Sequence, residues 1–147
     1  VAALKATLLH HALVVTPNIP EAEVLSGITI AGLDDAKRAA ERLRGSRGPA
    51  VIVKGGHAGG AEVVDLLFDG NRFYEFRMPR IDSRNTHGTG CTFASAIAAG
   101  LALGQALPDA TARAQAYVAD AIRGGLAIGG GHGPLDHFWA LRDAPPR

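Results

Sequence analysis

The chain contains a single cysteine among its 147 residues and few aromatic side chains, 5% in all. One cysteine cannot form a disulfide within the chain, which favours a reducing compartment. Basic residues number 15 against 14 acidic ones, so the sequence lacks the positive charge expected of a nucleic-acid-binding domain. No apolar run approaches the ~20 residues that a membrane span needs. We therefore expect a cytoplasmic protein that binds neither nucleic acid nor membrane.

Apolar residues and glycine are abundant, at 47% of the chain and 19 residues respectively. This composition is typical of one globular domain large enough to bury a core. The first residue is Val1, and the segment that follows it, up to His11, resembles the end of a helix already under way. We therefore interpret the chain as a fragment whose N-terminal part is missing.

Alternating strand and helix patterns predict an α/β fold with a mostly parallel sheet and an antiparallel edge hairpin. Apolar runs bounded by proline or glycine predict strands, and an i, i+3, i+4, i+7 apolar spacing predicts helices. In chain order we expect a strand at 13–15, a helix at 20–27, an amphipathic helix at 32–48 that stops near Gly45, a buried strand at 50–53, a hairpin around Asp69–Asn71, helices at 91–103 and 107–125, and a frayed end at 143–147.

The stretch NTHGTGC, residues 85–91, lies directly before a helix pattern rich in small residues. Glycines at a helix start leave backbone N–H groups accessible at the positive end of the helix dipole, which favours an anion such as phosphate. Cys91 falls in the first turn, where the same dipole favours a thiolate. The alternative, a capped loop with an inert cysteine, stays open, because neither the P-loop pattern nor G-x-G-x-x-G is present.

Four stretches together resemble one known family. NTHGTGCTFASAIAAGLALG is similar to the active-site signature of the hydroxymethylpyrimidine/phosphomethylpyrimidine kinases, a branch of the ribokinase-like superfamily. TPNIPEAEVLSG, VIVKGGH and GHGPLDHFWA agree with the same family in the same order. A cysteine in place of the aspartate that is common in the superfamily marks this branch. The resemblance implies a ribokinase-like fold in which residues 1–147 form the C-terminal, ATP-binding and catalytic part of a single kinase domain.

The resemblance also implies roles for individual residues. Gly88, Thr89, Gly90 and Cys91 match the anion hole for the transferred phosphate, and Cys91 matches the position of the catalytic base. A second reading has Cys91 only lining the pyrimidine pocket.

The family's N-x-x-E motif falls on Asn18 and Glu21, which implies that Asn18 helps to hold the nucleotide phosphates and that Glu21 helps to hold Mg²⁺. From the residues alone, both would be read as turn and first-turn residues. Lys54, Gly55 and Gly56 match the loop that lies against ATP, which implies that Lys54 contacts a phosphate and that the two glycines let the chain approach the nucleotide closely. The resemblance gives His87 no role.

The implied activity is transfer of phosphate from ATP, with Mg²⁺, to 4-amino-5-hydroxymethyl-2-methylpyrimidine and then to its monophosphate. Members of the family often dimerise, so a homodimer is an expectation from the resemblance alone. A pyridoxal or pyridoxamine kinase of the same superfamily is an alternative that Cys91 disfavours. A truncated, non-catalytic nucleotide-binding module is another, which the absence of an N-terminal half supports. A hydrolase with Cys91 as nucleophile and His87 as base is disfavoured, because no orienting acid is evident.

Overall fold

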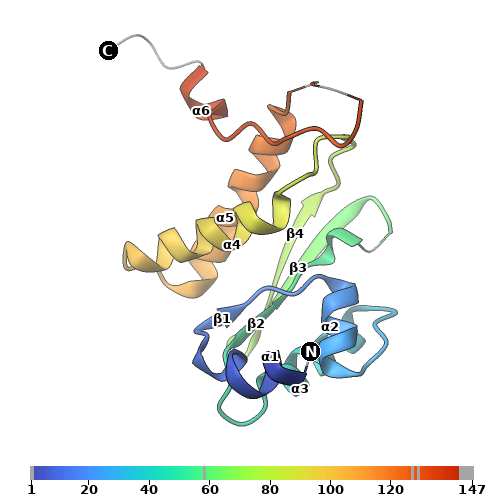
Figure 1. The fold of residues 1–147 in the computed structure, drawn as a ribbon, viewed down its shortest axis with the longest axis vertical. Helices are drawn as coiled ribbons and strands as arrows, with labels where there is room; N and C mark the ends of the chain where they lie inside the picture. The colour runs from blue at the N-terminus through green and yellow to red at the C-terminus, as the bar shows by residue number, and fades with distance from the viewer. Residues whose placement is uncertain (1, 58, 127, 129, 143–147) are drawn as a thin grey trace. The chain divides into compact units, whose positions relative to one another are not determined.

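The computed structural model describes residues 2–57, 59–126, 128 and 130–142 (Figure 1). The chain packs as two compact units, Val1–Arg80 and Ile81–Arg147. Within the described residues no helix is long and apolar enough to cross a membrane. The frayed end expected at 143–147 lies outside this part of the chain.

The first unit is built around a four-stranded sheet with the order β1-β2-β3-β4. β1 pairs in parallel with β2, whereas β2–β3 and β3–β4 are antiparallel. The α/β class and the antiparallel edge hairpin are confirmed, and the sheet formed by the described strands is mixed. The elements of this unit are α1 (Ala2–Thr7), η1 (Leu9–His11), β1 (Val14–Val15), α2 (Ile19–Ser26), α3 (Leu33–Arg44), β2 (Ala50–Val53), η2 (Gly55–His57), β3 (Glu62–Phe68) and β4 (Phe73–Pro79).

Helix α3 packs on the sheet as its apolar spacing predicts. Ala36 and Ala40 are buried against Val51 and Leu66 of the strands, in a core that also contains Ala22 of α2. Small side chains on this helix face let its backbone approach the sheet closely. The helix ends at Gly45, whose φ of 58° is the left-handed region that glycine adopts at low cost, so the predicted stop is confirmed.

The β3–β4 hairpin turns where the Asp-Gly-Asn sequence predicts. Asp69 accepts hydrogen bonds through Oδ1 from the backbone N–H groups of Asn71 and Arg72, at 2.7 and 2.9 Å, and through Oδ2 from Tyr74 Oη at 3.1 Å. The Arg72 and Asn71 amides stabilise the ionised carboxylate and so lower the pKa of Asp69. Gly70, with φ of 105°, supplies the backbone conformation that the turn requires.

An ion-pair network connects α3 with strands β3 and β4. Arg77 Nη2 lies 2.7 Å from Glu75, Arg77 Nη1 lies 3.5 Å from Glu62, and Lys37 Nζ lies 3.4 Å from Glu75. The hydrogen bond from Arg77 and the charge of Lys37 lower the pKa of Glu75. These side chains are partly exposed, so each pair contributes little on its own to stability.

The second unit is helical, with α4 (Thr89–Ala102), α5 (Leu107–Arg123) and a short α6 (Trp139–Arg142). α4 and α5 lie side by side in close contact (Figure 1). Gly100 allows this approach, since a Cβ there would come within 2.9 Å of the Ala110 Cβ. Both predicted helices are confirmed, and α4 begins at Thr89, slightly earlier than expected.

Candidate active site

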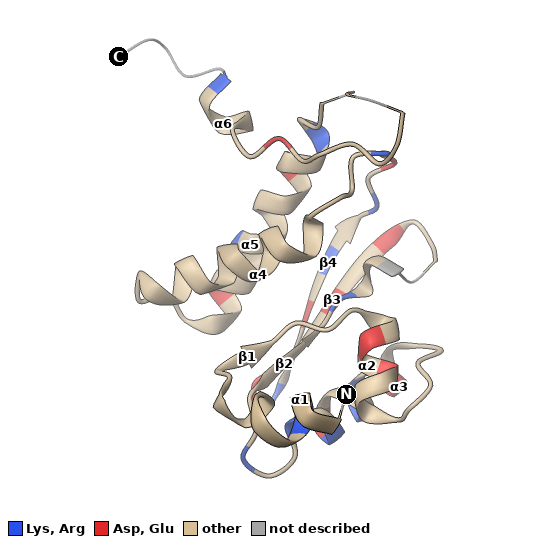
Figure 2. Cartoon of the chain, in the orientation of Figure 1, with Lys and Arg blue, Asp and Glu red and all other residues tan. Residues whose placement is uncertain are grey.

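Helix α4 begins with donors available for an anion. Gly88 is its N-cap residue, with φ of 88°, and no side chain caps the helix. The Thr92 amide donates to the Gly88 carbonyl at 2.9 Å, whereas within the described residues no hydrogen bond occupies the N–H groups of Gly90 and Cys91. α4 carries no acidic or basic side chain, as Figure 2 shows, so the field at its start comes from the backbone. Unpaired amides at the positive end of a helix can bind an anion.

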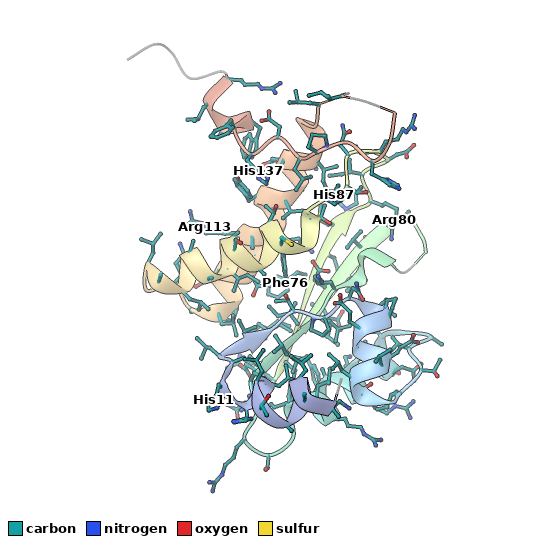
Figure 3. The ribbon with its side chains drawn as sticks, in the orientation of Figure 1. His11, Phe76, Arg80, His87, Arg113 and His137 are labelled. Atoms are coloured by element: carbon teal, nitrogen blue, oxygen red, sulfur yellow. The ribbon has the colours of Figure 1, made fainter. Side chains whose placement is uncertain are left out.

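Cys91 is exposed and lines a cavity of about 610 Å³ between α4 and α5. Thr92 and Ser95 line it on the α4 side, and Tyr117 and Arg113, the latter labelled in Figure 3, line it on the α5 side. The Cys91 sulfur can therefore be reached from solution by a small polar molecule. The alternative reading of the sequence expected a buried cysteine, and the exposure of Cys91 contradicts that part of it.

A tight contact supports the segment that leads into this helix. The Asn85 side chain packs closely against two glycines of the C-terminal loop. A Cβ added to Gly125 would lie 2.5 Å from the Asn85 side chain, and a Cβ added to Gly133 would overlap it. The Gly133 amide donates to the Arg84 carbonyl at 3.2 Å, and His87 forms a parallel backbone bridge with Pro134. His87 thus has a backbone role in holding the approach to α4.

In the first unit, Asn18 and Glu21 form a capping box at the start of α2. Glu21 Oε2 accepts from the Asn18 amide at 2.7 Å, and Asn18 Oδ1 accepts from the Glu21 amide at 2.8 Å. The turn and first-turn positions read from the residues alone are confirmed. The capping box itself was missed, although an Asn followed three residues later by Glu is its sequence signature.

Lys54–Gly56, which we call the KGG turn, follows β2 and lies beside the capping box. The Lys54 amide donates to the Pro17 carbonyl at 2.9 Å, and Lys54 forms a parallel bridge with Asn18. Gly55 is buried, and a Cβ on it would come within 2.1 Å of the Val64 carbonyl oxygen. Gly55 is therefore required by the neighbouring strand, whereas we expected both glycines to allow a ligand to approach. Gly56 is exposed.

A magnesium ion fits this arrangement only with ligands from outside the protein. The described residues contain no group of three His, Cys, Asp or Glu side chains that could hold a metal. Glu21 offers one exposed carboxylate, of which Oε2 is used by the capping box. Mg²⁺ commonly takes one or two carboxylates and completes its shell with water and substrate phosphates, so a single glutamate is chemically sufficient.

The predicted residues fall into two groups, one in each unit. Asn18, Glu21 and the KGG turn lie together at one edge of the sheet, and Gly88–Cys91 form the start of α4. Three residues that shape these groups were missed, namely Asp65, Arg80 and Asn85. For Asp65 the signal was a charged residue inside an apolar strand, and for Arg80 and Asn85 no local signal exists.

The chain matches the family model for phosphomethylpyrimidine kinase over residues 1–136. It is 50% identical over 147 residues to the thiamine biosynthesis bifunctional protein of Geobacter sulfurreducens, covering 100% of this chain and 30% of that one. It is 47% identical over 145 residues to the hydroxymethylpyrimidine/phosphomethylpyrimidine kinase of Bacillus subtilis, covering 98% of this chain and 54% of that one.

Among solved structures, the pyridoxal kinase of Staphylococcus aureus in complex with AMP-PCP and pyridoxal is similar with a TM-score of 0.89 and 39% identity, over 97% of this chain and 54% of that one. The chain thus spans about half the length of these single-function relatives. The ribokinase-like fold predicted from the four sequence stretches is confirmed by this structural similarity. The extent of the family match, over most of the chain, shows that it belongs to the phosphomethylpyrimidine kinase family.

Proposed function

We propose that the chain is the ATP-binding and catalytic part of a kinase that phosphorylates 4-amino-5-hydroxymethyl-2-methylpyrimidine and then its monophosphate. One observation carries this proposal beyond family membership. An exposed thiol lies in the first turn of a helix whose Gly90 and Cys91 amides have no partner among the described residues. Phosphoryl transfer depends mainly on positioning and on stabilising negative charge, and this helix start offers both.

In the proposed mechanism the helix start, Gly88–Cys91, receives the phosphate that is transferred. Its backbone amides donate to the phosphate oxygens and stabilise the charge that develops on them. The Cys91 thiolate accepts the proton of the substrate hydroxymethyl group, and the resulting oxygen attacks the γ-phosphorus of ATP while the bond to the β-phosphate breaks and ADP leaves. The exposure of Cys91 on the 610 Å³ cavity supports this role, since a base must reach the hydroxyl it deprotonates.

The KGG turn and the capping box serve the nucleotide in this proposal. Lys54 neutralises phosphate charge, and Asn18 and the backbone of Gly55 and Gly56 position the phosphates. Glu21 holds Mg²⁺ together with water and phosphate oxygens; when bound, the ion neutralises charge on the nucleotide. Support comes from the bridge between Asn18 and Lys54, which places these groups at one edge of the sheet. Both units belong to one kinase domain, and dimerisation stays a prediction.

A pyridoxal kinase activity is the second candidate. The sequence argument against it was Cys91, yet the chain is 39% identical to a pyridoxal kinase solved with pyridoxal and AMP-PCP. The substrates of both candidate activities have a six-membered ring that contains nitrogen and carries a hydroxymethyl group. The two candidates differ in the ring that is recognised, a pyrimidine that carries an amino group or a pyridine that carries an aldehyde, and not in the phosphoryl-transfer groups described above.

The experiment uses the protein in the full length that its gene encodes. It is incubated with ATP and Mg²⁺ and, separately, with the hydroxymethylpyrimidine, its monophosphate and pyridoxal, and products are identified by mass spectrometry. We expect the pyrimidine mono- and diphosphate, with a kcat/KM higher than that for pyridoxal. Faster phosphorylation of pyridoxal would support the second candidate instead. Binding of AMP-PCP with no phosphorylation of any of the three would show a nucleotide-binding module.

A further inference from the structure

Asp65 is a carboxyl side chain inside the apolar run of strand β3. It is 6% exposed and stands beside Leu66 and Leu67, which are 1% and 0% exposed. Burying a carboxyl group costs free energy unless its oxygens are hydrogen-bonded. Oδ1 of Asp65 accepts a hydrogen bond from the Gly55 amide at 2.9 Å. The side chain therefore connects the interior of the sheet to the KGG turn.

Gly55 is held from two directions. Its amide reaches Asp65, and its α-carbon lies so close to β3 that an added Cβ would be 2.1 Å from the Val64 carbonyl oxygen. On the preceding residue, the Lys54 amide donates to the Pro17 carbonyl at 2.9 Å. The start of the KGG turn is thus fixed between the capping-box segment on one side and β3 on the other.

Arg80 holds the far end of the same turn. Its Nη1 donates to the Gly56 carbonyl at 3.0 Å and its Nε donates to the Gly60 carbonyl at 2.8 Å. Figure 3 shows Arg80 beyond the end of β4, and its backbone amide donates to the Ala61 carbonyl at 2.8 Å. A planar guanidinium can donate to two carbonyls in fixed directions, which an ammonium group cannot do as well.

We infer that Asp65 and Arg80 are positioning residues for nucleotide binding, acting through the KGG turn. Asp65 accepts from the backbone N–H at the beginning of the turn, and Arg80 donates to the backbone C=O at its end. A turn rich in glycine loses much conformational entropy when it is ordered. These two side chains order the KGG turn before the nucleotide binds, so the free energy of nucleotide binding is not reduced by the entropy of ordering the turn. The inference rests on the proposed nucleotide role of the turn.

Asp65→Ala and Arg80→Met test this inference in the full-length protein, with the dissociation constant of AMP-PCP as the main readout. We expect each variant to weaken AMP-PCP binding about tenfold, because each loses one hydrogen bond between a charged side chain and the KGG turn. Asp65→Asn keeps a carbonyl oxygen that can accept from Gly55, so it should restore most of the affinity. Amide hydrogen exchange at Gly55 should be faster in Asp65→Ala and close to wild type in Asp65→Asn.

Two variants in the same hairpin serve as matched controls. Asp69→Ala removes a carboxylate that accepts two backbone amides in the turn, and Arg77→Met removes a guanidinium that pairs with Glu62 and Glu75 on the strands. Neither residue contacts the KGG turn through a hydrogen bond or ion pair among the described residues. Both controls should leave AMP-PCP affinity unchanged, whatever their effect on the melting temperature; we expect Asp69→Ala to lower it and Arg77→Met, whose ion pairs are partly exposed, to change it little.

The outcomes separate the inference from the proposed function. If both test variants bind AMP-PCP as the wild type does, while their melting temperatures fall, the two residues are only structural and the inference is overturned. If the wild type binds AMP-PCP, the test variants bind it more weakly and no substrate is phosphorylated, the kinase activity fails and the positioning role stands. A wild type that does not bind AMP-PCP overturns both.

Discussion

Asn18 and Glu21 each accept a hydrogen bond from the other's backbone amide, at 2.8 and 2.7 Å, and so close the first turn of α2. The same two side chains are the proposed phosphate and magnesium contacts. A capping box stabilises a helix end whether or not a ligand binds there. Loss of activity after removing either side chain would therefore not by itself show a metal role, and the two contributions must be separated by the choice of substitution.

Glu21→Gln separates them. Glutamine keeps a side-chain oxygen that can accept from the Asn18 amide, but it removes the negative charge that attracts Mg²⁺. We expect the melting temperature to change little, while the Mg²⁺ concentration for half-maximal activity rises about tenfold or more, as loss of a charged ligand predicts. Asn18→Ala, in contrast, should destabilise the protein by about 1 kcal/mol, the usual cost of losing an N-cap.

Glu23→Gln is the control for Glu21→Gln. Glu23 belongs to the same helix and accepts a hydrogen bond from the Ile30 amide at 2.8 Å. The variant removes the same charge from the same helix, away from the capping box. We expect its Mg²⁺ titration to overlay that of the wild type. Identical Mg²⁺ dependence in the Glu21 and Glu23 variants would remove Glu21 from the metal site.

Features set by local chemistry could be predicted from the sequence. The apolar spacing of Ala36, Ala39, Ala40 and Leu43 specifies which face of α3 is buried, and Asp69-Gly70-Asn71 specifies a turn, because neighbouring residues determine both. The helix start at Gly88 could be predicted in the same way, because it depends on a glycine and on the helix pattern that directly follows it.

Contacts between distant residues could not be predicted in this way. Gly55 appeared to be a ligand-approach position, yet its close neighbour is the Val64 carbonyl on another strand. Asn85 packs against Gly125 and Gly133, which are far away in the chain. Such contacts depend on strand register and loop path, which the pattern of one segment does not encode. The functional roles, for their part, came from resemblance to a family.

Cys91→Ala should lower kcat by about 10² to 10⁴, the range typical for loss of a general base. AMP-PCP affinity should stay close to wild type, because the proposed phosphate contacts of the helix start come from backbone amides. Cys91→Ser, with a weakly acidic hydroxyl, should recover little activity. If nucleotide binding is lost in Cys91→Ala while Cys91→Ser phosphorylates the pyrimidine normally, Cys91 is not the base and lines the pocket instead. Steady-state kinetics and calorimetry measure the two quantities.

Asp69 should contribute stability that depends on pH. The Arg72 and Asn71 amides lower the pKa of its carboxyl group in the folded protein below the ordinary value, so this contribution is fully present above that ordinary value. It is lost as the pH falls through the lowered folded pKa. The difference in free energy of unfolding between the wild type and Asp69→Ala should therefore be largest at neutral pH and shrink in acid. Urea unfolding at several pH values measures it, and a constant difference would contradict the assignment.

Gly88 and Gly104 stand at opposite ends of α4 with similar backbone conformations, φ of 88° and 80°, and neither has an atom within 4 Å of an added Cβ. Gly88→Ala and Gly104→Ala should each destabilise the protein by about 1 kcal/mol through left-handed backbone strain. Only Gly88→Ala should also lower kcat, because it alters the amides that we propose face the transferred phosphate. Thermal unfolding and steady-state kinetics compare the pair. Equal kcat values in the two variants would mean that Gly88 serves the helix end alone, and the anion site would have to be placed elsewhere.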